Sequence, residues 1–112
     1  MLVAFYDNLE PTSVDDLPGF AQVERIYGFD WDGFLEVHWQ ELSRIYQALP
    51  GSVRYREIPY WFGDDEARPP FLGASVEPSG LQVNGILPLE GWSAWDEQFR
   101  AASGELPMRV LD

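Results

Sequence analysis

Three consecutive carboxylates form the part of this sequence that most resembles a chemical site. Asp64, Asp65 and Glu66 follow Trp61 closely and precede two prolines that stiffen the segment. Such a group could bind a divalent cation weakly or supply a general acid and base, but acid–base catalysis needs a second group across a cleft. A solvated hairpin loop and a loop that presents charge to a partner fit the same pattern. We assign these four residues to partner binding and no residue to catalysis.

A second acidic and aromatic segment reads Asp30-Trp31-Asp32-Gly33. It looks briefly like a calcium loop, but aligning Gly33 with the required turn glycine puts a Gly and a Trp at the two end positions, where carboxylates belong. The sequence therefore excludes an EF-hand. Helix capping and compensation of the helix dipole explain both aspartates, while Trp31 is a candidate exposed platform. We include Asp30, Trp31 and Asp32 among the candidate binding residues.

The lone histidine, His38, lies three residues before Glu41 on the same predicted helix. The pair could form half of a metal site, but the chain has no other His and no Cys, so we predict no metal and no cofactor. Its place on the apolar side of the helix predicts a partly buried, structural histidine. Arg54 and Arg56 share one face of a predicted strand and could clamp a carboxylate or phosphate, although internal ion pairing is the simpler expectation.

The charge balance limits the classes of partner. Nineteen Asp and Glu stand against seven Arg and no Lys, giving a formal net charge of −12. This charge attracts a basic partner and repels nucleic acid. The absence of Cys removes disulfides and thiolate chemistry and predicts a cytoplasmic location. The apolar run at 1–6 is too short, and lacks the basic flank, for a signal peptide or a membrane span, so no membrane association is expected.

The elements that must position these residues follow from the hydrophobic periodicity. The run at 3–6 predicts a buried strand, and cap residues at 12–16 followed by apolar residues at near-helical spacing predict a short helix ending at Gly28. The clearest element is an amphipathic helix over 33–49, with Asp32 placed to cap it. Its apolar positions recur at steps of four and three: Leu35, Trp39, Leu42, Tyr46 and Leu49.

The second half of the chain predicts strands and a final helix. Period-two alternation predicts a strand over 53–62 with an irregularity at Pro59, and strands at 71–77 and 81–87 joined by a tight turn. Helical spacing returns from Trp92 to Ala102, and 108–111 could form a last strand. These elements predict an α+β fold: a small, mostly antiparallel sheet of about four to five strands packed by two to three helices, in a single domain over 1–112.

The hypothesis that these features favour is a non-enzymatic acidic module that binds and neutralises or regulates a basic protein, as an immunity protein, an inhibitor or a mimic of nucleic-acid charge would. One alternative is a small enzyme or ligand-binding domain with a cleft around His38, Glu41, Arg54 and Arg56. Another is an acidic accessory subunit or a homo-oligomeric domain. The first predicts binding that weakens steeply with salt, and the second a rate or affinity that changes as His38 titrates.

Overall fold

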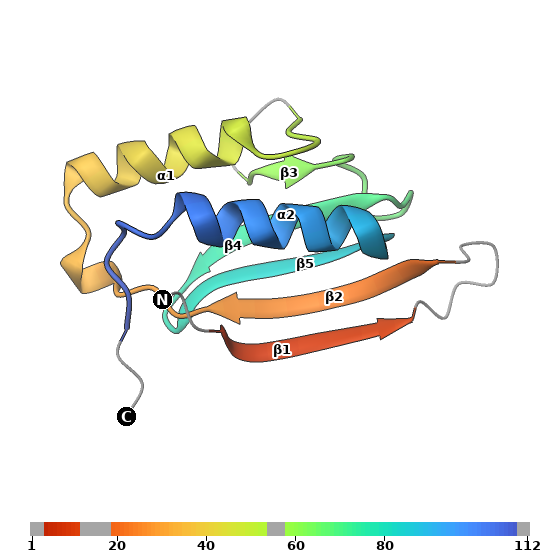
Figure 1. The fold of residues 1–112 in the computed structure, drawn as a ribbon, viewed down its shortest axis with the longest axis horizontal. Helices are drawn as coiled ribbons and strands as arrows, with labels where there is room; N and C mark the ends of the chain where they lie inside the picture. Colours follow the sequence, from red (N-terminus) through yellow and green to blue (C-terminus); the bar gives the residue numbers. More distant parts are fainter. Residues whose placement is uncertain (1–3, 12–18, 54–57, 110–112) are drawn as a thin grey trace.

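A computed structural model describes the backbone of residues 4–11 and the backbone and side chains of residues 19–53 and 58–109. These described residues form five strands and two α-helices, with a short 3₁₀ helix before the first α-helix (Figure 1). In chain order the elements are β1 (Ala4–Pro11), β2 (Phe20–Tyr27), η1 (Trp31–Gly33), α1 (Glu36–Ala48), β3 (Tyr60–Trp61), β4 (Phe71–Glu77), β5 (Gly80–Pro88) and α2 (Leu89–Ala102).

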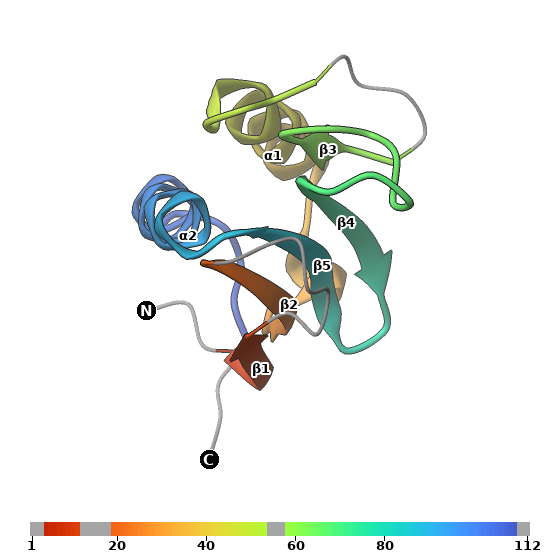
Figure 2. The same ribbon diagram turned by 90° about the vertical axis from the view of Figure 1, so that its right-hand side faces the viewer.

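The strands form one antiparallel sheet in the order β1-β2-β5-β4-β3. Both helices lie on the same face of this sheet, α2 beside β2 and β5, and α1 beside β3 and β4 (Figure 2). The predicted α+β class and the antiparallel sheet are confirmed, and β3, β4 and β5 are consecutive neighbours in the sheet. The predicted strand at the N-terminus is longer than expected and occupies an edge of the sheet rather than its interior.

The core lies between the sheet and the two helices. Alternate residues of β2 and β5 face the helices and are buried, as the pleat of a one-sided sheet requires. Large aromatic side chains fill most of the space, which is the usual way for a small domain to bury much apolar area with few residues. The largest fully buried side chains include Trp61, Trp95, Tyr27, Phe29 and Phe99.

The prediction of a helix that ends at Gly28 is wrong for the described residues, because Phe20–Tyr27 forms the strand β2. Its buried positions alternate, but one of them is Arg25, which is only 6% exposed. A charged residue on the buried face hides the period-two pattern of apolar residues, so the remaining apolar spacing imitates a helix. The cap residues assigned to that helix at 12–16 lie outside the described residues.

The later elements follow the predictions closely. The amphipathic helix, the strand at 71–77, the strand at 81–87 and the final helix are confirmed, although α1 begins at Glu36, three residues later than expected. The predicted strand over 53–62 is reduced to the two residues of β3, and its positions 54–57 lie outside the described residues. Met108 makes an isolated antiparallel bridge with Phe29, and positions 110–111 of the predicted last strand are not described.

The β4–β5 hairpin packs tightly against the end of β2. Gly80 has φ +147°, and a Cβ built there would lie 1.9 Å from the carbonyl oxygen of Tyr27, so no larger residue fits without a shift. This close approach places the hairpin turn beside the segment that leads from β2 into η1. In the described ranges, neither α-helix is long and apolar enough to cross a membrane.

Candidate functional site

The two acidic segments singled out in the sequence lie at opposite ends of the molecule. The η1 segment lies where β2 finishes and α1 begins, and the 64–66 segment lies in the loop between β3 and β4 (Figure 1). They therefore cannot form one compact site. Each has to be judged by what its carboxylates and aromatic rings contact.

Trp61 is not the exposed platform that the sequence predicts. Its side chain is 0% exposed, and its indole N–H donates a hydrogen bond of 2.9 Å to the carbonyl oxygen of Tyr46. Its ring meets Tyr46 and Trp95 edge-on, with centroids 5.5 and 5.0 Å away. The side chain belongs to the core, so a partner that contacts the 64–66 loop finds no aromatic anchor in it.

Within that loop, Asp65 is occupied by local structure. One carboxylate oxygen accepts a hydrogen bond of 2.9 Å from the backbone N–H of Ala67, and the other lies 3.6 Å from Nε of Arg68. Asp64 and Glu66 are exposed and join none of the ion pairs among the described residues.

The loop lies close to Tyr60 on β3. Burial raises the pKa of the Tyr60 phenol, and the negative charges of Glu66 and Asp64 raise it further. Glu66 and Tyr60 also line a small, open depression on the sheet that includes Asn84. The loop thus places negative charge beside a shallow surface of mixed character, in which Ile58 is the large exposed apolar residue among those that line the depression.

The aspartates at η1 do not cap helices, contrary to expectation. The Asp30 side chain makes no capping hydrogen bond to η1, and α1 begins at a later residue than Asp32 could cap. The start of α1 is capped instead by His38, whose Nδ1 accepts a hydrogen bond of 2.9 Å from the backbone N–H of Leu35. In the described part of the chain, neither aspartate side chain forms a hydrogen bond or an ion pair.

Trp31 links η1 to both the sheet and α1. Its indole N–H donates a hydrogen bond of 2.7 Å to the carbonyl oxygen of Glu77, at the end of β4. Its ring stacks on Trp39 at a centroid distance of 5.2 Å and an interplanar angle of 12°, and meets Phe34 edge-on at 4.9 Å. Trp39, expected in the core, is 41% exposed. The two indoles form a fixed, partly accessible pair.

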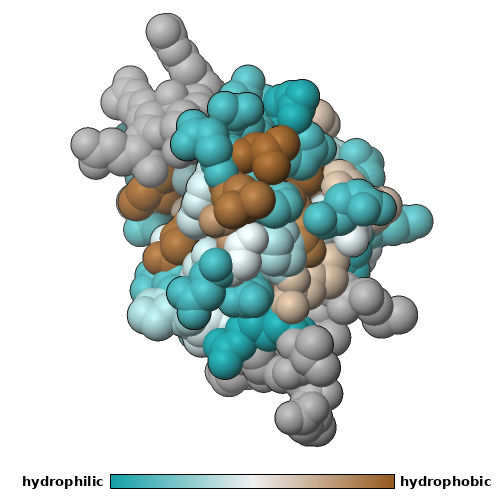
Figure 3. Space-filling view, turned by 90° about the vertical axis from the view of Figure 1, so that its left-hand side faces the viewer, coloured by the Kyte–Doolittle hydropathy of each residue, from teal (hydrophilic) through white to brown (hydrophobic). Residues whose placement is uncertain are grey.

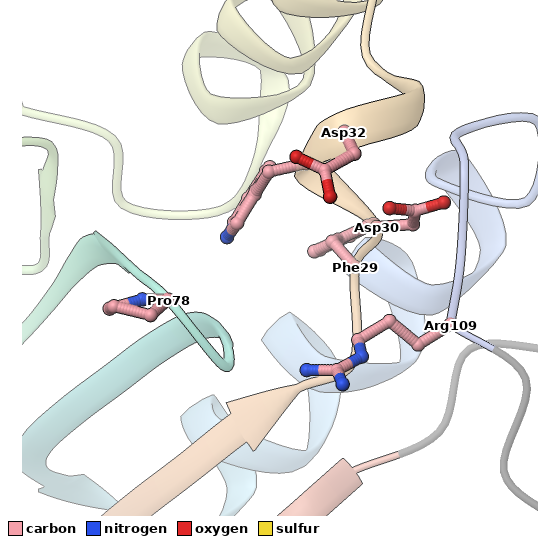
Figure 4. A pocket seen from close by; sticks show the side chains of 6 residues that line it. Phe29, Asp30, Asp32, Pro78 and Arg109 are labelled. Atoms are coloured by element: carbon pink, nitrogen blue, oxygen red, sulfur yellow. The ribbon is translucent and has the colours of Figure 1, made fainter.

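An open pocket of about 420 Å³ lies beside this pair. Figure 4 shows the side chains of Asp32 and Arg109 reaching toward it from opposite sides, with Pro78 of the hairpin turn at its margin. The residues that line it are Phe29, Asp30, Trp31, Asp32, Pro78 and Arg109. None of the ion pairs between described residues joins Arg109 to the two aspartates.

The sequence did not identify Arg109 as part of this site. The C-terminal segment reaches the pocket because the backbone N–H of Arg109 donates a hydrogen bond of 2.9 Å to the carbonyl oxygen of Gly28. The strand expected over 108–111 was the only sequence feature that could have indicated Arg109 as part of this site.

Large hydrophobic side chains are exposed at the start of α1, a few residues after Asp32 of the pocket lining. The first turn of α1 extends beyond the end of the sheet in Figure 1, so the sheet does not cover it. Leu35 is 65% exposed and Val37 58% exposed. Figure 3 shows hydrophobic side chains on this end of the molecule with hydrophilic side chains around them. We call Trp31, Leu35, Val37 and Trp39, with the carboxylates Asp30, Asp32 and Glu36, the η1–α1 surface.

A second cluster of charged and aromatic groups lies between β2 and α2. Asp96 accepts hydrogen bonds on one carboxylate oxygen from the Tyr27 hydroxyl at 2.5 Å, from Arg25 at 2.6 Å and from Nε of Arg100 at 3.0 Å. The Arg25 guanidinium also lies over the ring of Trp92, 4.8 Å from its centroid. We call Arg25, Tyr27, Asp96 and Arg100 the β2–α2 cluster.

The β2–α2 cluster has a structural role, which is to hold α2 on the sheet. Burial alone would raise the pKa of Asp96, but hydrogen bonds from Tyr27 and Arg25, and the charge of Arg25, hold it below its usual value. Burial, the hydrogen bond to Asp96 and its charge raise the pKa of Tyr27 far above the ordinary value. Asp96 is thus held ionised and Tyr27 neutral, which fixes α2 on the sheet. Periodicity does not reveal this cluster, because the residues around Arg25 are predicted to be helical.

The alternative cleft around His38, Glu41 and the two arginines is not brought together by the described residues. Glu41 forms an ion pair of 2.5 Å with Arg44 and lines an open groove between α1 and α2, whose lining does not include His38. Arg54 and Arg56 lie outside the described residues. Among the residues with described side chains, no three His, Cys, Asp or Glu lie close enough together to hold a metal ion.

Comparisons with known proteins give no identification. No protein family, curated protein or solved structure matches this chain.

Proposed function

We propose that this protein is a non-enzymatic binding module that neutralises or regulates a basic protein partner, in the manner of an immunity protein or inhibitor. The observation that supports it most is the combination, on the η1–α1 surface, of large exposed hydrophobic groups with carboxylates that have no ion-pair partner among the described residues. Binding surfaces of this kind pair apolar anchors with complementary charge.

The overall charge supports the same proposal. A net charge of −12 on 112 residues steers a basic protein toward the molecule and raises its association rate at low ionic strength. Long-range attraction of this kind acts on a whole face of a partner and needs no particular contact. The exposed carboxylates of the 64–66 loop fit this steering role, whereas the η1–α1 surface is the place where short-range contacts can add affinity.

The first test is a pull-down with the tagged protein from lysate of its own source organism, at low and at moderate salt, with mass spectrometry of the retained proteins. The proposal expects a basic protein that is retained at low salt and released as salt rises, because screening weakens surface electrostatics. The purified partner should then bind the purified protein directly in calorimetry.

Competition by an unrelated basic protein is the control for specificity. An unrelated basic protein of similar size, added in excess, should not displace the specific partner, since affinity also depends on apolar contacts. Retention of acidic proteins only, retention that salt does not change, or displacement by any basic competitor would contradict the proposal.

A further inference from the structure

We infer that the η1–α1 surface is the contact face of this protein, and that its occupant is a segment of a basic protein in which apolar side chains stand next to Arg or Lys. This inference rests on the proposed function and goes beyond it by assigning the surface and the chemistry of the bound segment. Four features of the described residues carry it.

The first feature is the concentration of exposed apolar groups. Three exposed large hydrophobic residues, the N-cap residue Leu35 and Val37 and Trp39 of α1, lie within five consecutive positions. Single exposed hydrophobic residues are ordinary on protein surfaces, as Leu89 is at the start of α2. A group of them, enclosed by polar residues, marks an interaction site.

The second feature is charge. Residues 28–39 carry the three carboxylates Asp30, Asp32 and Glu36 and no Arg, and with Arg109, which lines the same pocket as the two aspartates, negative charges still outnumber positive ones by three to one. A partner that covers the apolar groups must approach these carboxylates, and only Arg or Lys side chains turn that approach into attraction.

The third feature argues against a second copy of this chain as the occupant. In a two-fold symmetric dimer the same surface would face itself, bringing two sets of three carboxylates together. Each copy also carries a net charge of −12, which opposes association. A basic partner removes both costs.

The fourth feature is the rigidity of the anchors. The Trp31 ring is held by its hydrogen bond to Glu77 and by its stack on Trp39. A partner that binds to this pair does not have to order it first, which reduces the entropic cost of association. Aromatic anchors that are fixed before binding are typical of the residues that dominate interface energetics.

The test uses a synthetic peptide rich in Leu and Arg, a second peptide with Ser in place of Leu, and a third with Glu in place of Arg. NMR of the isotope-labelled protein follows the indole N–H signals during titration. We expect the first peptide to shift the signals of Trp31 and Trp39 and to leave buried Trp95 unchanged. The Ser peptide should bind about tenfold more weakly, because losing apolar anchors costs more than about 1 kcal/mol. The Glu peptide should not bind.

Matched variants locate the site. Leu35→Ser combined with Val37→Ser should weaken binding of the Leu and Arg peptide about tenfold. Leu89→Ser, which changes an exposed hydrophobic residue at the other end of the molecule, should leave binding unchanged. Equal binding of the Ser peptide, an equal effect of the Leu89 variant, or dimers of the free protein in sedimentation would overturn the inference.

The outcomes separate this inference from the proposed function. If the pull-down recovers a basic partner that binds the Leu35 and Val37 variant as tightly as the unaltered protein, the contact face is wrong and the proposed function stands. If no basic partner is recovered while the peptides behave as expected, the proposed function fails and the chemistry of the surface stands.

Discussion

Charged groups and aromatic rings meet in two regions of this molecule, the β2–α2 cluster and the η1–α1 surface. In the cluster, Asp96 accepts hydrogen bonds from Arg25, Arg100 and Tyr27, and the Arg25 guanidinium lies over an indole ring. On the surface, Asp30 and Asp32 have no ion-pair partner among the described residues and lie next to indole rings that are partly accessible.

The same residue types have different roles in buried and in exposed surroundings. A carboxylate that is buried among its partners holds two elements together, and its removal leaves charges that the fold has taken out of water. A carboxylate in water contributes little to stability and remains available to another molecule. Substitutions in the cluster should therefore change stability, and substitutions on the surface should change binding.

The largest expected effect is on Asp96. Asp96→Asn removes the negative charge that faces two arginines, and we expect it to lower the free energy of unfolding by about 3 kcal/mol. Urea denaturation followed by tryptophan fluorescence measures this change. The control is Glu97→Gln, which alters the next, exposed residue of the same helix and should change the free energy by less than about 0.5 kcal/mol. Equal effects of the two substitutions would show that the cluster does not hold α2.

The next largest effect is expected for Trp39, where a substitution should weaken partner binding more than it lowers stability. Trp39→Ala removes the exposed half of the indole stack, so partner binding should weaken by about 2 kcal/mol, as for an interface hot spot. The free energy of unfolding should fall by only about 1 kcal/mol, the usual worth of an aromatic pair. Calorimetry with the partner and urea denaturation give the two values. A loss of stability larger than the loss of binding would assign Trp39 to the core, as its helical spacing suggested.

The free energy of unfolding should depend on pH through two residues of the β2–α2 cluster, Asp96 in acid and Tyr27 in alkali. The fold lowers the pKa of Asp96, so its contribution is complete above the ordinary carboxyl pKa of about 4 and is lost as pH falls through the lowered value. The fold raises the pKa of Tyr27, so its contribution is complete below about pH 10 and is lost as pH rises above that.

Thermal unfolding measured across pH tests both slopes. Asp96→Asn should reduce the loss of stability in acid, and Tyr27→Phe should reduce the loss in alkali. A curve for either variant that runs parallel to that of the unaltered protein would separate that residue from the cluster.

The smallest effect is expected at the 64–66 loop. Asp64→Asn combined with Glu66→Gln removes two negative charges beside Tyr60 and should lower the pKa of its phenol toward the ordinary value. The ring signals of Tyr60 in an NMR titration measure it. Burial is the larger cause, so part of the shift should remain. An unchanged pKa would show that the carboxylates of Asp64 and Glu66 lie too far from the Tyr60 phenol to affect it.

Much of the fold can be predicted from periodicity alone. The steps of four and three in α1 and the paired runs of β4 and β5 were sufficient, because each pattern is set by burial of one face. β2 was mistaken for a helix because buried Arg25 interrupts its apolar alternation. Sequence periodicity cannot anticipate a buried ion pair whose partner, Asp96, is 71 residues away.

The candidate site shows a similar division. The acidic and aromatic character of Asp30, Trp31 and Asp32 is visible in the sequence, and the structure places all three at one pocket. The burial of Trp61 could not be predicted, since its hydrogen bond to Tyr46 depends on how α1 packs against β3. The entry of Arg109 into the pocket likewise depends on a contact with a residue distant in the sequence, Gly28, which directly follows β2.

Whether the η1–α1 surface is the contact face can be decided by comparing two charge-matched variants for binding to the recovered basic partner across a series of salt concentrations. Asp30→Asn with Asp32→Asn removes two charges from the η1–α1 surface, and Asp64→Asn with Glu66→Gln removes two from the far loop. The account predicts that the first variant loses about tenfold in affinity even at moderate salt, because contacts at short range are lost. The second should lose affinity only at low salt. Equal losses in the two variants at every salt concentration would mean that net charge alone binds the partner, and would contradict the account.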